Sequence, residues 1–335
     1  MTSVEEKIRQ QARKLLSEKA VDLVIGYETA VLPLRTSVCF IRSPEEVGRL
    51  VWNHTCSPNL AVYLPQFFQK PKGVKGQWLP PKIGIVAKGC DSRSIVSLIR
   101  ARQIDRTRLF IIGVPCESMI DRHKAAHEVA SGQMGALAGA EVLGDMVRLW
   151  NTDGVEKKVK VENLLAASCL ACAHRQPVIS NVNLTEAASP AATSAVGYTD
   201  VAEFEAMPAE KRWEYFVSEL SRCVRCYACR QACPNCYCRE CFAEESSPRW
   251  LGVTTDLSDV IMFHLGRLLH QAGRCVDCGA CVAACPQGID LRLFSRKMAK
   301  DVAELFGEDS QVSQDEPETL CRFTMNDNQD FITEP

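Results

Sequence analysis

One cysteine pattern, CxxCxxCxxxCP, occurs twice in the carboxyl-terminal half of the chain. The copies read CVRCYACRQACP at 223–234 and CVDCGACVAACP at 275–286. This spacing is typical of cubane iron–sulfur clusters: three thiolates on one tight loop bind three irons, and in two-cluster ferredoxins the fourth cysteine binds the other cluster. The chain is therefore predicted to hold two 4Fe-4S clusters.

The crossed pattern of such ferredoxins divides the eight cysteines into two sets. The first set is Cys223, Cys226, Cys229 and Cys285, and the second set is Cys275, Cys278, Cys281 and Cys233. The alternative is a pair of zinc ribbons built from CxxC hooks. Zinc ribbons require neither a third cysteine at the same step nor a CP ending in both copies, so the pattern favours iron–sulfur clusters.

Composition limits the classes of protein to which the chain can belong. With 335 residues, of which 46% are apolar and 24% charged, it suits two or three globular domains. A net charge of -2 provides no positive electrostatic potential that would attract nucleic acid or an anionic membrane surface. The 18 cysteines are arranged as metal-binding repeats, which need a reducing compartment.

The same composition indicates a cytoplasmic location. The amino terminus, MTSVEEKIRQQARKLL, is charged and lacks the apolar core of a signal peptide. No uncharged apolar stretch reaches the roughly 18 residues needed for a membrane span, so any membrane association is expected to come through a partner protein.

The amino-terminal half contains a strand–helix–strand unit. Strands are expected at 82–88 and 108–114, separated by a turn at 89–91 and a helix at 92–103, as in a right-handed parallel crossover. Ligands of open parallel sheets gather beyond the carboxyl ends of the strands. Cys90 and Cys116 follow the two strands, so we expect them at one edge of the sheet.

The remaining segments complete an expected architecture. Helices are predicted at 3–20, from Ser43, mainly throughout 117–150, after Pro208 and at 257–271, and strands at 21–26 and at the start of 157–165. The fold class is an α/β amino domain with a parallel sheet, followed by a mainly α-helical dicluster ferredoxin domain. The expected boundaries are 1–188 for the α/β domain, 189–204 for a linker, 205–307 for the dicluster domain and 308–335 for an acidic tail.

Further cysteines fall into two groups with open alternatives. Four in the amino-terminal half are either ligands of a third 4Fe-4S cluster, which needs four, or small buried hydrophobic residues, and their expected place at a sheet edge favours the cluster: Cys90, Cys116, Cys169 and Cys172. Three more follow the first run, and are either additional metal ligands or structural thiols: Cys236, Cys238 and Cys241. With Cys233 these three also have the number needed for a zinc site, which would remove Cys233 from its cluster.

Other polar and cysteine residues are expected to have ordinary roles. The isolated Cys39, Cys56 and Cys321 are interpreted as ordinary residues. His123 and His127 share one helical face but lack the HExxH context of a zinc site, so they are interpreted as packed or solvated. Two more residues lie at the start of a helix whose amides could hold a flavin phosphate, although a helix cap is the preferred interpretation: Asp91 and Arg93.

Two resemblances follow from these motifs. The stretch at about 205–305, with RCVRCYACRQACP and RCVDCGACVAACP, resembles the helical dicluster ferredoxin domains of heterodisulfide-reductase small subunits and of succinate and glycerol-phosphate dehydrogenases. The stretch at about 15–185, with KGCDSRSI, IIGVPC and CLAC, resembles the beta-subunit family of deazaflavin-reducing hydrogenases and formate dehydrogenases. This second resemblance implies an iron–sulfur cluster, FAD and a place in a larger redox complex.

Three functions are compatible with the sequence. The preferred one is an iron–sulfur electron-transfer subunit of an anaerobic oxidoreductase complex of the hydrogenase, formate dehydrogenase or heterodisulfide-reductase type. The alternative is an FAD-containing subunit that exchanges hydride with a deazaflavin or nicotinamide carrier, although the chain lacks the GxGxxG fingerprint. An iron–sulfur sensor requires only one labile cluster and fits the doubled pattern less well.

Overall fold

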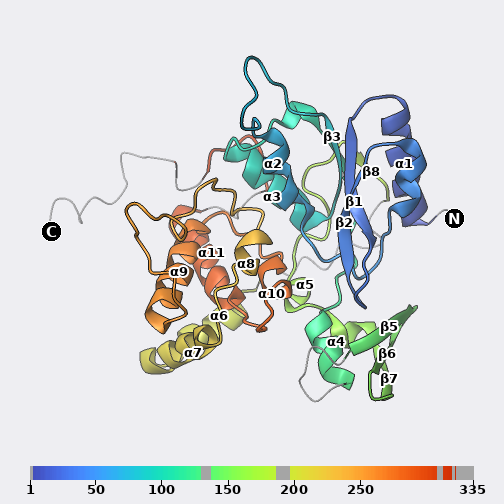
Figure 1. Cartoon of the computed structure of the whole chain (residues 1–335). Coiled ribbons are helices and arrows are strands. Elements are labelled where there is room, and N and C mark those ends of the chain that lie inside the picture. The colour runs from blue at the N-terminus through green and yellow to red at the C-terminus, as the bar shows by residue number, and fades with distance from the viewer. Residues whose placement is uncertain (1–2, 130–136, 186–196, 308–311, 319–320, 322–335) are drawn as a thin grey trace.

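The computed structural model describes residues 3–129, 137–185, 197–307, 312–318 and 321. It contains an amino-terminal α/β part, a small three-stranded sheet and a carboxyl-terminal helical part (Figure 1). Within the described residues, no helix is long and apolar enough to cross a membrane.

The main sheet has five strands in the order β2-β1-β3-β4-β8. The strand β1 pairs antiparallel with β2 and parallel with β3, and β4 is parallel to both β3 and β8. The bounds of these strands are β1 Leu23–Thr29, β2 Thr36–Ile41, β3 Ile83–Ala87, β4 Leu109–Gly113 and β8 Val182–Asn183. The predicted parallel crossover is confirmed, because α3 (Gly89–Arg100) connects β3 directly to its neighbour β4.

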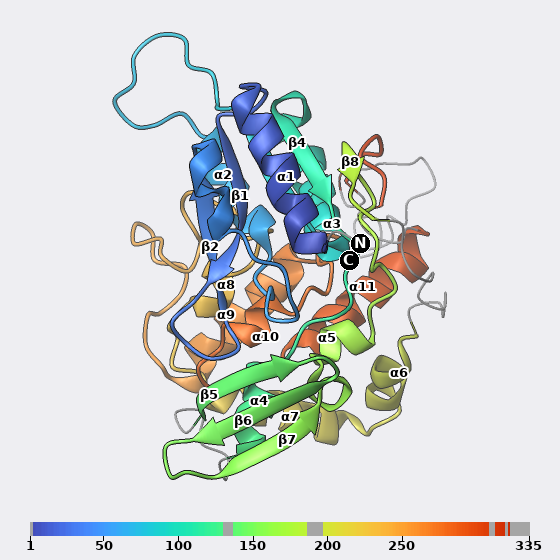
Figure 2. The same cartoon turned by 90° about the vertical axis from the view of Figure 1, so that its right-hand side faces the viewer.

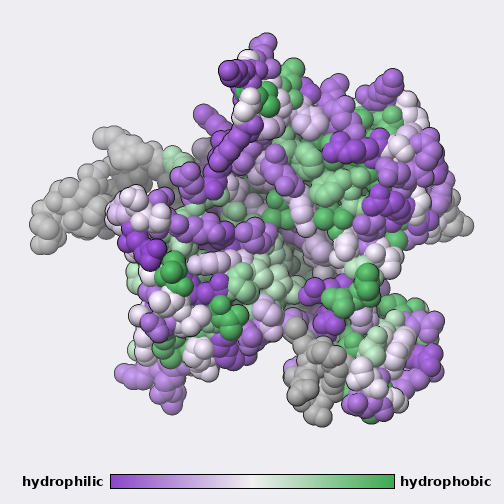
Figure 3. Space-filling model, in the orientation of Figure 1, coloured by the Kyte–Doolittle hydropathy of each residue, from purple (hydrophilic) through white to green (hydrophobic). Residues whose placement is uncertain are grey.

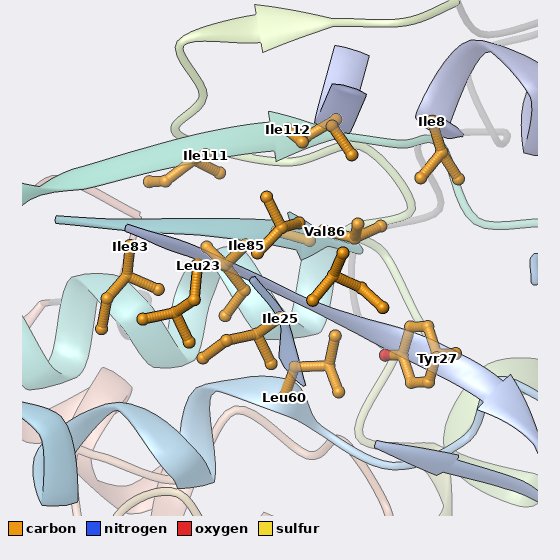
Figure 4. Packing of buried hydrophobic residues seen from close by; sticks show 14 of the residues in the cluster. Ile8, Leu23, Ile25, Tyr27, Leu60, Ile83, Ile85, Val86, Ile111 and Ile112 are labelled. Carbon is orange, nitrogen blue, oxygen red and sulfur yellow. The ribbon is translucent and has the colours of Figure 1, made fainter. Parts of the chain in front are cut away.

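The core of the α/β part lies on both faces of this sheet. Helix α1 (Val4–Ser17) covers one face, and α3 lies on the face toward the carboxyl-terminal helices (Figures 1 and 2). Figure 4 shows isoleucines of β1, β3 and β4 packed together, with Ile8 of α1 on one side and Leu60 on the other. The strands read as continuous apolar runs because both faces are buried. Ser3 caps α1: its hydroxyl oxygen accepts a hydrogen bond from the Glu6 amide at 3.2 Å.

Short helices complete the amino-terminal half. The segment after Ser43 is a 3₁₀ helix, not the expected α-helix, and ends at Arg49. The other short helices are α2 Leu64–Phe68, α5 Ala167–Leu170 and the 3₁₀ helices η2 Leu60–Tyr63, η3 Arg106–Arg108 and η5 Val161–Leu164. The last of these follows a strand, as expected for 157–165.

The expectation that 117–150 is mainly helical is wrong. Only α4 (Arg122–Val129) is helical, and it is followed by strands β5 (Leu137–Leu143) and β6 (Met146–Asn151), which pair with β7 (Glu156–Lys160) in a second sheet. In β6 the buried Val147 and Leu149 alternate with less buried neighbours, which is the two-residue period of a strand. Gly144, with φ of 65°, supplies the tight turn before β6.

The carboxyl-terminal part is helical, as predicted. Its helices are α6 Thr199–Glu205, α7 Ala209–Ser221, α8 Ala228–Gln231, α9 Leu257–His270, α10 Ala280–Ala283 and α11 Arg292–Phe306. Helix α9 packs against α7 and α11, and a core that includes Phe216, Leu220 and Val260 joins them. Helix α6 begins inside the expected linker and ends one residue beyond it, and most of the expected acidic tail falls outside the described residues.

Candidate metal centres

The two cysteine runs have the same backbone conformation. In the first run, Arg225 and Tyr227 have positive φ values of 49° and 59°. In the second run, Asp277 and Gly279 occupy the same positions with φ values of 51° and 72°. Each run then forms a single helical turn, α8 or α10. Left-handed backbone is costly for residues other than glycine, and its repetition indicates that the loop shape itself is required.

This loop shape brings backbone amides to the cysteine sulfurs. The Arg225 amide donates to Cys223 Sγ at 3.4 Å. The corresponding amide of Asp277 donates to Cys275 and lowers the pKa of that thiol, although burial has the larger, opposite effect and holds the value at about 12. Amide donors of this kind stabilise thiolates, so each loop is suited to bind a metal.

The first predicted set of cysteines lies together. Burial raises the pKa of Cys223, and negative charge on Cys285 and Cys226 raises it further. Burial likewise raises the pKa of Cys229 to about 11, with contributions from Cys223 and Cys285. All four line one cavity of about 30 Å³ beside Phe263 and His264. Cys285, from the second run, therefore lies with the three leading cysteines of the first run.

The second predicted set is assembled in the same crossed manner. Burial raises the pKa values of Cys275, Cys278 and Cys281. Negative charge on Cys233 contributes to the increase at each of these three thiols. Cys233 belongs to the first run in sequence, but its Sγ donates to the side chain of Gln271 at 3.6 Å, and the carbonyl oxygen of Gln271 accepts from the Cys275 amide of the second run at 2.9 Å. Cys281 lines the cavity of the first set, so the two sets are neighbours, and its charge adds to the raised pKa of Cys229.

A zinc ion and a cubane cluster require different spacings between their ligands. Within the described ranges, no three side chains of His, Cys, Asp or Glu stand close enough to hold one ion. Thiolates around one zinc ion lie only about 4 Å apart, given Zn–S bonds of about 2.3 Å. A cubane places four irons between its ligands and needs a wider arrangement.

The four cysteines of the amino-terminal half, Cys90, Cys116, Cys169 and Cys172, are called the amino-half set and lie at the carboxyl edge of the main sheet. Cys90 follows β3 and Cys116 follows the neighbouring strand β4, and negative charge on Cys116 contributes to the raised pKa of Cys90. Burial raises the pKa of Cys116 to about 11, and charges on Cys169 and Cys172 add to the increase. All four line a cavity of about 150 Å³ between the two halves of the molecule. The Met119 amide donates to Cys169 Sγ at 3.3 Å.

This amino-half set adjoins the second set. Cys278 lines the same cavity; partial burial raises the pKa of Cys90, and negative charge on Cys278 adds to the increase. Ser168, next to Cys169, packs so closely on Gly279 that a Cβ atom at position 279 would collide with its hydroxyl oxygen. Space-filling Figure 3 shows the molecule hollowed between the carboxyl-terminal helices and the small sheet.

A buried ion pair lies directly behind Cys90. Lys88 Nζ is 3.0 Å from Asp91 Oδ2, and it also donates to the carbonyl oxygens of Cys56 at 2.9 Å and Pro58 at 3.0 Å. Burial alone lowers the pKa of Lys88, but Asp91, Tyr27 and the thiols more than offset this, so the pKa is raised. Sequence reasoning missed Lys88, because a lysine at the end of an expected strand gives no signal of burial.

The two residues considered for flavin binding contact the protein itself. Asp91 is buried and accepts hydrogen bonds from the amides of Leu60 and Lys88, each at 2.9 Å. Arg93 Nη1 donates to the Val276 carbonyl oxygen at 3.2 Å. Arg93 therefore connects α3 to the second cysteine run, while Asp91 fixes the start of α3.

The three additional cysteines are not gathered into one group. Cys236 shares a side-chain hydrogen bond with Cys233, which lowers the pKa of Cys233. Cys238 is exposed. Cys241 lies near Arg230, whose pKa is raised first by Glu244 and also by this thiol. Of the three, Cys236 is the one that lies beside a predicted cluster ligand.

The isolated cysteines and the histidine pair occupy different surroundings. Cys39 and Cys56 pack in the core of the α/β part, where burial raises their pKa values to about 12 and about 11, as expected for ordinary core residues. Cys321 is exposed. His123 and His127 lie in α4, and His123 also lines the cavity of about 150 Å³ between the two halves, called the large cavity below.

No family model matches this chain, whereas individual proteins do. The F420-dependent formate dehydrogenase subunit beta of Methanocaldococcus jannaschii is 31% identical over 103 residues, which cover 31% of this chain and 26% of that protein. The match thus spans about a quarter of that relative's length. Subunit beta of F420-dependent formate dehydrogenase 1 from Methanococcus maripaludis is 21% identical over 320 residues, covering 77% of this chain and 78% of the relative.

A solved structure of the F420-reducing [NiFe] hydrogenase complex from Methanosarcina barkeri, derivatised with xenon, aligns with 52% of this chain and 64% of its own chain. The TM-score is 0.33 and the sequence identity is 14%. The resemblance that KGCDSRSI, IIGVPC and CLAC indicated is confirmed by the sequence relatives: this chain is related to the beta subunits of F420-dependent formate dehydrogenases.

Proposed function

We propose that this chain is an electron-transfer subunit of an oxidoreductase complex, in which its three cysteine sets hold 4Fe-4S clusters in series. The observation that carries the proposal is the adjacency of the sets. Cys90 of the amino-half set and Cys278 of the second set line one cavity, and Cys281 of the second set and Cys229 of the first set line another. Electron transfer between clusters requires short distances, whereas three independent structural metal sites would not need to lie close together.

The cysteine sets also fit the chemistry of a cluster. When bound, an iron–sulfur cluster supplies one-electron transfer at a potential set by charge, hydrogen bonds and exposure. The chain contributes amide donors to Cys223, Cys169 and Cys285, the last from the Ile289 amide at 3.4 Å. It also encloses the sets with apolar side chains such as Phe263, which restrict access of water.

The proposed order along the relay runs from the amino-half set through the second set to the first set. The junction between the two halves is made by Arg93, which contacts Val276, and by Ser168, which packs on Gly279. At the far end, Cys226 is exposed and its neighbour Val224 is half exposed. That end is suited to exchange electrons with another protein.

The names of the relatives and the exposed Cys226 end of the relay both support a partner protein. Both sequence relatives are named as subunits of formate dehydrogenases, so we propose that this chain works with a catalytic dehydrogenase or hydrogenase subunit. A heterodisulfide-reductase-like subunit is an equivalent partner in the same role. The chain is proposed to act in the cytoplasm, where its thiols remain reduced.

A second candidate function is that of an FAD-containing subunit, which exchanges hydride with a deazaflavin or nicotinamide carrier. The observation that favours it is the extent of the large cavity. This cavity continues beyond the amino-half cysteines to Arg35, Arg122 and Tyr198. Cationic side chains of this kind suit the phosphates of a dinucleotide.

Anaerobic purification with its partner subunits, followed by metal, sulfide and flavin analysis, tests both candidates. The relay predicts about twelve iron and twelve sulfide per chain, because each of three cubanes carries four of each. It also predicts that the isolated chain is reduced by dithionite but shows little turnover with nicotinamide or formate until a catalytic subunit is added. Flavin-dependent reduction of a dye by the chain alone would favour the second candidate, and a chain without iron would contradict the relay.

A further inference from the structure

Helix α9 carries a polar stripe on a buried face. His264, Arg267 and the C-cap residue Gln271 are only 2%, 5% and 5% exposed. Their spacing of three and four residues places them on one side of the helix. Polar residues at buried positions are retained where they have partners, so the partners of this stripe indicate its role.

The two ends of the stripe reach different cysteine sets. At one end, His264 Nε2 lies 3.4 Å from Cys223 Sγ, in the first set. At the other end, the Gln271 side-chain amide lies 3.6 Å from Cys233 Sγ, in the second set, and 3.5 Å from Cys236 Sγ. Helix α9 therefore spans both sets, and the middle residue of the stripe lies between them.

Arg267 is that middle residue, and it lines one cavity together with Cys229 of the first set and Cys281 of the second set. Its Nη2 donates to the Cys229 carbonyl oxygen at 3.3 Å, and its side chain lines the cavity of the first set. Burial alone lowers the pKa of Arg267. Negative charges on Cys281, Cys233, Cys229 and Cys236 more than offset this, so the pKa is raised. No carboxylate in the described part of the chain forms an ion pair with Arg267.

A buried guanidinium of this kind requires negative charge close by. Arginine keeps its charge at any pH a protein experiences, and burying an unpaired charge is costly. Neutral thiols would not balance it, whereas thiolates that bind iron would. The position of Arg267 between Cys229 of the first set and Cys281 and Cys233 of the second makes its charge available to both.

We propose that Arg267 is a shared counter-ion of the first and second cysteine sets and that it raises the reduction potential of both clusters. The inference rests on the proposed function, because it requires that the sets hold iron. Reduction adds one electron, and so one negative charge, to a cluster. A fixed positive charge stabilises that reduced form, and its position between the sets shifts both potentials in the same direction.

Redox titration with paramagnetic-resonance detection of the reduced clusters tests this role. Arg267→Met removes the charge and the hydrogen bonds, whereas Arg267→Gln removes the charge but keeps an amide donor for the Cys229 carbonyl. Both variants are expected to lower both midpoint potentials. Arg267→Lys keeps the charge and is expected to lie closer to the wild-type chain. Arg249→Met, at an exposed position between the two runs, is the matched control and is expected to shift neither potential.

The outcomes separate this role from a packing role. Unchanged potentials at full iron content in the neutral variants, or a shift in one cluster alone, would overturn the proposal. If both neutral variants lose iron, recovery of both clusters in Arg267→Lys supports the counter-ion, and equal loss in all three variants contradicts it. A wild-type chain without iron would overturn the proposed function instead, so the two failures are distinguishable.

Discussion

The Arg93 guanidinium donates to the carbonyl oxygen of Val276 at 3.2 Å and thereby joins the two halves of the chain. Arg93 lies in the first turns of α3, close to Cys90, whereas Val276 follows the first cysteine of the second run. The contact is buried and lines the cavity between the amino-half set and the second set. It therefore holds two of the proposed clusters at a fixed separation.

Replacement of Arg93 is expected to loosen this junction. Arg93→Met removes a charged donor from a buried carbonyl, which typically costs about 2 kcal/mol of unfolding free energy. Electron transfer from the amino-half set to the second set should also slow, because transfer falls steeply with separation. Urea unfolding and flash-induced reduction kinetics measure the two effects. Arg13→Met, on the exposed side of α1, is the control and should change neither quantity.

The iron content is expected to report the amino-half cluster. Cys169→Ser should lower iron and sulfide from about twelve to about eight per chain, because one cubane is lost. Cys321→Ser, at an exposed and isolated cysteine, should leave the content unchanged. An iron content near eight in both the wild-type chain and Cys169→Ser would contradict a third cluster.

The crossed arrangement of the fourth cysteines predicts which signal each variant loses. Cys233→Ser should damage the cluster of the second set, and Cys285→Ser the cluster of the first set, because each cysteine lies with the opposite run. Paramagnetic resonance of the two variants distinguishes the clusters by their spectra. If Cys233→Ser and Cys226→Ser altered the same signal, each run would close its own cluster and the crossed arrangement would be wrong.

The buried pair behind Cys90 is expected to be important for folding. Lys88→Met leaves the Asp91 carboxylate buried without its partner, and breaking a buried pair typically costs about 3–5 kcal/mol. Unfolding under anaerobic conditions should show this loss. The double variant Lys88→Met/Asp91→Asn should recover part of it, because no uncompensated charge remains. Lys82→Met, at an exposed lysine just before β3, should have little effect.

Some of these features could be predicted from sequence because they depend on local patterns. The apolar runs at 82–88 and 108–114 indicate buried parallel strands, and neighbouring strands necessarily bring Cys90 and Cys116 to one edge. The repeated cysteine spacing likewise led to the crossed sets before any contact was known. In each case the signal lies within one segment or in the repetition of one segment.

Other features could not be predicted, because they arise only from tertiary packing. The stretch at 137–151 includes Ala and Gly residues, which do not favour strands, and its sheet forms through the pairing of β5 with β6 and of β6 with β7. Lys88 and Arg267 look like ordinary surface cations in the sequence. Their burial depends on residues far away in the chain, such as Tyr27 for Lys88 and Cys281 for Arg267.

The two cysteine runs share one backbone conformation but differ in side chain at the equivalent positions Tyr227 and Gly279. The side chain of Tyr227 packs edge-on against Phe263, with ring centroids 5.1 Å apart. At Gly279 the missing side chain leaves the space that Ser168 fills. A duplicated loop could face the amino-terminal half with either copy, but only the copy without a Cβ atom can approach it closely. The missing Cβ atom at Gly279 thus decides that the second set lies next to the amino-half set and that the first set lies at the outer end.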